Sequence, residues 1–126
     1  MLAVCLMPKH VNDLEICAAI ILYLCEMILY NVTFIIEELA AEEWLQWMQV
    51  VHIPEVMATD KFVSNRLLKI LDSPNEGVTY CAQYIAENEA NYQDYQTNFA
   101  PALQAKLQAK FESRVLAFRT LMTFVD

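Results

Sequence analysis

The chain of 126 residues holds few side chains of types that do chemistry, and His52 is the first candidate. It follows Trp44 and Trp47 in the stretch EWLQWMQVVHIPEV. Imidazole titrates near neutral pH, so His52 could act as a general acid or base. The alternative is that His52 lies at a helix end and caps the last backbone carbonyls. Trp44 could line a ligand pocket, with core packing as its alternative role.

Two arginines, Arg66 and Arg119, fall within predicted strands. A guanidinium group binds carboxylates in a bidentate way, so a clamp for a carboxylate or an enolate is one interpretation. A salt bridge at a strand edge or a contact across a dimer is the other. Three further strand residues are candidate ligand contacts: Asn31, Gln83 and Tyr84.

The bulk composition excludes several classes of protein. Eight Lys and Arg against sixteen Asp and Glu give a net charge of −8, which argues against binding to nucleic acid or to an anionic membrane. Gly77 is the single glycine, so no glycine-rich phosphate loop is possible. The sequence shows no Ser-His-Asp arrangement, no catalytic carboxylate dyad and no set of metal ligands. Neither a metal nor another cofactor is predicted.

The first 26 residues differ from the rest of the chain. An apolar run of ten residues, Ile16–Cys25, is too short to span a bilayer and lacks the flanks of a secretory signal. Residues 1–26 are therefore expected to be an extension. They are either a short helix over Asp13–Cys25 or sequence translated upstream of a start at Met27. Four cysteines without a CxxC pair favour a reducing compartment, hence the cytoplasm.

Residues 27–126 are predicted to form one domain, because polar and apolar residues alternate with strand and helix periods in turn. A first helix begins at the Glu37-Glu38 pair, and Pro54 is expected to stop it, with a continuation in a short turn around Glu55 to Met57 as the alternative. A second helical region, Asn88–Phe111, is divided near Pro101. The strands are expected at Ile28–Ile36, Phe62–Leu71, Val78–Ile85 and Val115–Val125.

The resulting order, β-α-β-β-α-β, predicts an α+β fold of the ferredoxin-like type. Its four-stranded antiparallel sheet would have the strand order 4-1-3-2, with both helices on one face. The other face is half apolar and would be poorly soluble if exposed, which predicts a homodimer. Its expected residues are Asn31, Thr33, Ile35, Arg66, Leu68, Thr79, Cys81, Gln83, Ala117, Arg119 and Leu121.

The chain from Met27 onward resembles a family of short, uncharacterised bacterial proteins with a dimeric α+β barrel fold. The resemblance rests on the blocks YNVTF, EWLQWMQVVHIPEV, VTYCAQY, APALQ and AFRTL. It implies a ferredoxin-like dimer whose protomers each have a pocket between sheet and helices. The superfamily includes antibiotic-biosynthesis monooxygenases, muconolactone isomerases and haem-degrading monooxygenases. Close relatives tend to carry a histidine where this chain has Phe99, so a mechanism that needs that histidine is not expected, and haem degradation is not predicted.

The leading hypothesis is therefore a small cytoplasmic homodimer that binds an apolar or aromatic small molecule. One alternative is a cofactor-independent enzyme of the monooxygenase or isomerase type, with His52 as the catalytic proton shuttle. Another is a structural dimer whose interior is filled by its own side chains.

Overall fold

The structure, a computed structural model, describes residues 15–18 and 26–126. Residues 15–18 are helical, and the remainder of the expected Asp13–Cys25 helix lies outside the described residues. The predicted order of elements in the main domain is confirmed. The elements are β1 (Ile28–Ile36), α3 (Glu38–Trp47), η1 (Met48–His52), α4 (Ile53–Met57), β2 (Ser64–Ile70), β3 (Val78–Ala86), α5 (Glu89–Asn98), α6 (Ala100–Phe111), η2 (Glu112–Arg114) and β4 (Val115–Thr123).

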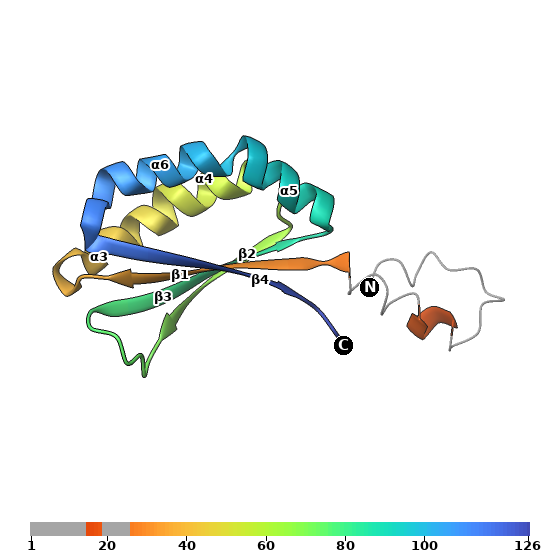
Figure 1. The fold of residues 1–126 in the computed structure, drawn as a ribbon, viewed down its shortest axis with the longest axis horizontal. Helices are drawn as coiled ribbons and strands as arrows, with labels where there is room; N and C mark the ends of the chain where they lie inside the picture. Colours follow the sequence, from red (N-terminus) through yellow and green to blue (C-terminus); the bar gives the residue numbers. More distant parts are fainter. Residues whose placement is uncertain (1–14, 19–25) are drawn as a thin grey trace.

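The strands form one antiparallel sheet in the order β2-β3-β1-β4, as predicted. All the helices from α3 to α6 lie over one face of this sheet, and the opposite face carries no element of the main domain (Figure 1). Because β1 and β3 are central, β2 and β4 are the two sheet edges. No helix in the described part of the chain is long and apolar enough to cross a membrane.

The core lies between the sheet and the helices, because alternate residues of β1 point to the same side. Tyr30, Val32, Phe34 and Ile36 are all buried there. Trp44 of α3 packs on this layer, with its ring 4.9 Å from that of Phe34. Burying such aromatic and aliphatic side chains supplies most of the free energy that stabilises the sheet against the helices.

The first helix does not stop at Pro54, so the expected stop was wrong, whereas the alternative of a continuation around Glu55 to Met57 is confirmed. The helix that begins at Glu38 continues to Met57 through the π-helical turn η1 and then α4. The Ile53 N–H donates to the carbonyl of Met48, five residues back, which widens the turn. Pro54 consequently lies in the first turn of α4, where its missing N–H costs little.

Strand β4 presents the opposite faces from those expected. Arg119 pairs with Val32, and Ala117 pairs with Phe34, so both lie on the helix-covered side. Leu121 pairs with Tyr30 and lies on that side too. Placing Ala117, Arg119 and Leu121 on the uncovered face was therefore wrong. The uncovered face of β4 instead holds Leu116, Phe118, Thr120 and Met122. Both sets are rich in apolar side chains, so alternation alone does not choose between them.

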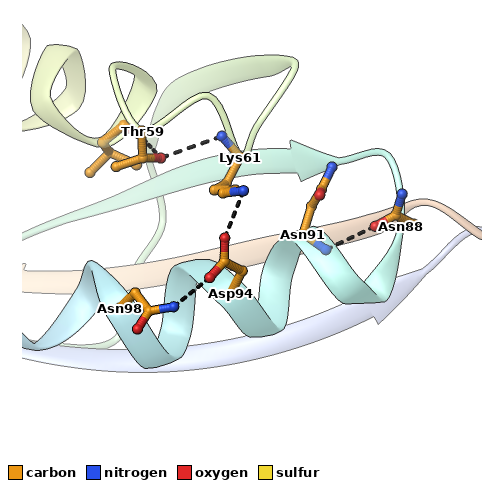
Figure 2. A network of polar contacts seen from close by, with 7 residues as sticks. Thr59, Lys61, Asn88, Asn91, Asp94 and Asn98 are labelled. Carbon is orange, nitrogen blue, oxygen red and sulfur yellow. Dashed lines mark hydrogen bonds and ion pairs between the residues drawn. The ribbon is translucent and has the colours of Figure 1, made fainter.

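The loop before β2 is fixed to α5 by a polar network (Figure 2). The Lys61 ammonium lies 2.6 Å from the Asp94 carboxylate, which also accepts a hydrogen bond from Asn98. The Asn88 side chain caps α5 by accepting a 2.8 Å hydrogen bond from the Asn91 N–H. These contacts tie the loop to the surface of α5, whose Tyr92 and Tyr95 pack in the core.

Candidate functional site

A small cavity lies between the sheet and the helices. Its volume is about 20 Å³, enough for a single water molecule or one ligand oxygen. Strands β1, β3 and β4 and helices η1, α4, α5 and α6 all contribute to its wall. The lining residues are Tyr30, Val32, Phe34, His52, Val56, Tyr84, Tyr95, Gln104, Leu107 and Arg119.

His52 reaches this cavity from the last position of the π-helical turn. Its side chain is 8% exposed, and its Nδ1 atom is buried without a hydrogen-bond partner. Its ring lies 5.1 Å from that of Trp47. Because the helix continues past it, His52 does not cap a helix end, and that interpretation was wrong.

The imidazole of His52 is neutral at physiological pH. Burial lowers its pKa to about 4, and the charges of Arg119 and Lys106 act in the same direction. The carboxylate of Glu55 opposes the shift without cancelling it. A neutral imidazole keeps one unprotonated ring nitrogen, which accepts a hydrogen bond.

Arg119 comes from the edge strand β4 and meets Tyr30 of the central strand β1 at the cavity. Burial raises the pKa of the Tyr30 hydroxyl, and this shift is opposed by the charge of Arg119 and by hydrogen bonds with Arg119 and Gln104. Arg119 forms no ion pair with any carboxylate of the described residues. Its guanidinium therefore has donors available for an anionic group from outside the chain.

Two further phenols complete the interior wall. Burial raises the pKa values of Tyr84 and Tyr95, so both hydroxyls stay protonated at neutral pH. The ring of Tyr95 packs edge-on against Phe62 with centroids 4.7 Å apart, and that of Tyr84 lies 5.2 Å from Phe62. The cavity is thus polar at the hydroxyls and aromatic around them.

A larger groove adjoins the cavity on the outer side, between α6 and β4. Its volume is about 420 Å³, which is in the range of small-molecule sites. Gln104, Leu107 and Arg119 line both the groove and the cavity, so the two spaces meet at these three side chains. The remaining groove residues are Pro101, Ala105, Gln108, Val115, Leu116 and Ala117.

The structure divides the predicted site residues between the two faces of the sheet. His52, Tyr84 and Arg119 come together at the cavity. Arg66 and Gln83 instead line a hollow of about 320 Å³ on the uncovered face. Asn31 lies on that face as well, since it pairs with Gln83.

Asn31 is largely buried despite lying on the uncovered face, where it is 7% exposed. Its side-chain nitrogen donates a 3.0 Å hydrogen bond to the Thr33 hydroxyl, and its side-chain oxygen has no partner among the described residues. Trp44, the remaining predicted ligand contact, is fully buried between Phe34 and Tyr80 and does not line the cavity.

Gln104 was not among the residues predicted from the sequence. A signal was present, because Gln104 interrupts the apolar positions Ala100, Leu103, Leu107 and Phe111 of α6. A polar residue on the buried stripe of a helix needs a partner, and here Tyr30 and Arg119 stand next to it.

The fold and the position of the cavity define a ferredoxin-like α+β protein with a small site between sheet and helices. Residues 27–125 match the sequence family described as a domain of unknown function, DUF4286. The chain belongs to that family. No protein of curated function matches the chain.

Solved structures with this fold are similar in shape and distant in sequence. A mutant of SnoaB, a cofactor-independent oxygenase from Streptomyces nogalater, has a TM-score of 0.59 at 15% identity, covering 80% of this chain and 95% of that one. A protein of the ethyl tert-butyl ether D (EthD) family from Bacillus halodurans has a TM-score of 0.58 at 13% identity, covering 77% of this chain and 98% of that one. A dimeric ferredoxin-like protein from an uncultured marine organism has a TM-score of 0.54 at 9% identity, covering 80% and 96%.

Proposed function

We propose that this protein binds a small molecule with an apolar or aromatic body in the groove between α6 and β4. The proposal is carried by a groove of about 420 Å³ that lies next to the polar cavity. Three side chains line both spaces and form a shared wall. That wall holds a guanidinium without a carboxylate partner, and behind it lies a buried imidazole nitrogen without a hydrogen-bond partner. A guanidinium without a carboxylate partner and a free imidazole nitrogen, beside a groove with several apolar side chains, can orient a bound ligand.

Binding is favoured over catalysis by the state of His52. A general base works best when its pKa lies near the operating pH. With a pKa of about 4, the imidazole is a good hydrogen-bond acceptor and a weak proton acceptor. The site as it stands can therefore hold a ligand more readily than it can abstract a proton.

A cofactor-independent oxygenase or isomerase is the second candidate. It is supported by the unpartnered Nδ1 of His52, since an anionic group bound beside the ring would raise the pKa of the imidazole. SnoaB, which shares the fold, is a cofactor-independent oxygenase. Oxygen consumption with an enolisable aromatic substrate would support this candidate, provided that His52→Phe abolishes it. If a ligand binds and no reaction is detected, only the binding function is supported.

The proposed working unit is a cytoplasmic homodimer formed through the uncovered sheet face. Several large apolar side chains on that face are between about a third and three fifths exposed: Leu68 at 42%, Ile70 at 37%, Leu116 at 56%, Phe118 at 55% and Met122 at 42%. Such a patch is costly to leave in water, and a second copy offers an equally apolar surface. The similar marine ferredoxin-like protein is described as dimeric.

Blocking the groove tests the proposed function. Ala105 is an exposed residue of α6 that lines the groove, whereas the equally exposed Ala109 on the same helix does not. We expect Ala105→Trp to weaken binding of an apolar fluorescent probe such as anilinonaphthalene sulfonate at least about tenfold, because the indole fills the space that the ligand needs. Ala109→Trp is the matched control and should bind the probe like the parent protein.

Equal binding by both variants would show that the groove is not the site. A purely structural dimer would bind no small molecule in either form. This alternative is consistent with the small interior cavity, and only ligand binding at the outer groove separates it from the proposed function.

A further inference from the structure

Two polar groups with opposite hydrogen-bonding roles lie where the groove meets the cavity: Arg119 lines both spaces, and His52 lines the cavity alone. Arg119 can only donate, and it has no carboxylate partner among the described residues. The unpartnered nitrogen of His52 is an acceptor in the tautomer that leaves Nδ1 unprotonated. A ligand that suits both groups brings an acceptor for Arg119, which is most favourable when negatively charged, and a donor for His52.

The space beside Arg119 is larger than the space beside His52. Arg119 belongs to an exposed edge strand and lines the wide groove, where a carboxylate and a ring fit. His52 faces the inner cavity of about 20 Å³, which accommodates about one oxygen atom. The apolar side chains of Leu107, Val115 and Ala117 line the groove and would contact the flat body of the ligand.

We propose that the ligand is an aromatic hydroxy acid, whose carboxylate binds Arg119 in the groove and whose hydroxyl enters the inner cavity and donates to His52. This assignment rests on the proposed function, because it specifies the ligand of the same groove. The hydroxyl would also meet Tyr30 and Gln104, which stand beside Arg119 in the cavity wall. Each charge-assisted or buried hydrogen bond made in this way adds to the affinity.

The groups around His52 keep it an acceptor over the working pH range. Glu55 of α4, Lys106 of α6 and Arg119 of β4 are the charged residues that influence it. The neutral phenols Tyr30, Tyr84 and Tyr95 complete the cavity. A ligand hydroxyl is therefore matched to this position, and a ligand methoxy group, which can only accept, is not.

The test is a matched ligand series measured by isothermal titration calorimetry on the full-length protein at pH 7. The series consists of 4-hydroxybenzoate, 4-methoxybenzoate, benzoate and 4-hydroxybenzamide. We expect 4-hydroxybenzoate to bind roughly tenfold more tightly than each of the other three, because each of them lacks one of the two polar groups. Equal affinity across the series would overturn the proposal.

Variants of the protein assign each preference to one residue. In Arg119→Gln the preference for the acid over the amide should be lost while the preference for hydroxyl over methoxy remains. In His52→Phe the reverse is expected, and His52→Gln, which keeps an acceptor oxygen, should restore part of the hydroxyl preference. Circular dichroism and thermal unfolding report whether each variant is folded. The comparison of ligands on the parent protein stands even where a variant unfolds.

Failure of this inference is distinguishable from failure of the proposed function. If anilinonaphthalene sulfonate binds and Ala105→Trp blocks it, while the benzoate series shows no preference, the groove is a binding site for another class of molecule. If Ala105→Trp affects neither the probe nor the benzoates, both proposals are wrong.

Discussion

The ring of His52 lies 5.1 Å from the ring of Trp47, with an angle of 31° between their planes. The two positions are five apart in the sequence (i and i+5), whereas neighbours on a regular α-helix are three or four apart. The π-helical turn over Met48–His52 makes this contact possible and aims His52 at the interior cavity. Single π turns of this kind are frequent at functional sites, because they re-orient side chains within a helix.

The first prediction concerns the pH dependence of stability. The pKa of His52 falls from 6.5 to about 4 on folding, so the unfolded chain binds a proton more readily than the folded protein does. The stability that depends on the neutral ring is complete above pH 6.5 and is lost as the pH falls toward 4. Urea unfolding should show a loss of about 2 kcal/mol between pH 7 and pH 5.

The substitution His52→Phe should remove that loss, because phenylalanine does not titrate. The interval from pH 7 to pH 5 lies above the ordinary pKa values of carboxylates, which keeps their contribution small. A variant that loses stability as steeply as the parent protein would show that His52 is not responsible.

The second prediction concerns Gly77, whose φ of +85° is one that side chains rarely adopt. A Cβ atom there would lie 2.3 Å from the carbonyl oxygen of Ile36, which is far too close. Gly77→Ala should therefore destabilise the protein by about 2 kcal/mol or more, measured by urea unfolding. Glu76→Ala, at the exposed neighbouring residue, is the control and should change stability by less than about 0.5 kcal/mol.

The third prediction is a stabilising substitution at Glu112, the residue between α6 and β4. Its φ of 51° and ψ of −128° are strained for any residue with a side chain. Glu112→Gly should relieve that strain and raise the free energy of unfolding by about 1 kcal/mol, after the entropic cost of glycine. Ser113→Gly at the next position, where φ is not positive, should destabilise instead. A lower melting temperature for Glu112→Gly would contradict the strain argument.

The fourth prediction tests the homodimer. Phe118 lies on the uncovered face opposite Thr33 and is 55% exposed in the single chain. Phe118→Glu should produce a monomer in sedimentation equilibrium at micromolar concentration, because it places a charge within the apolar contact. Leu39→Glu, on helix α3 and fully exposed, should leave the dimer intact. A parent protein that sediments as a stable monomer would rule out this interface.

Local sequence patterns predicted the positions of some candidate site residues and not of others. The burial of Tyr30 and Tyr84 follows from alternation along β1 and β3, whose core-facing sides are distinctly more apolar. Arg119 was predicted to interact with a ligand, but from the uncovered face of the sheet. Its true side depends on the pairing of β4 with β1, and β4 is apolar on both sides.

His52 shows the same limit within a helix. The sequence predicted a helix from the Glu37-Glu38 pair onward, and Pro54 predicted its end. The chain instead forms a π turn that places Pro54 in the first turn of α4 and buries His52 and Ile53 together. This outcome depends on packing of the helix against the sheet, which no local propensity describes.

The sequence itself determined three features: the order of strands and helices, the ferredoxin-like sheet and the apolar second face. These features follow from periodicity and turn residues, which act over a few positions. The tertiary structure alone decided that His52, Tyr30, Gln104 and Arg119 meet at one cavity beside a groove. The physical reason is that strand register and the π turn are properties of pairing and packing between distant segments. Their energies are set by contacts that exist only after the sheet and the helices have come together.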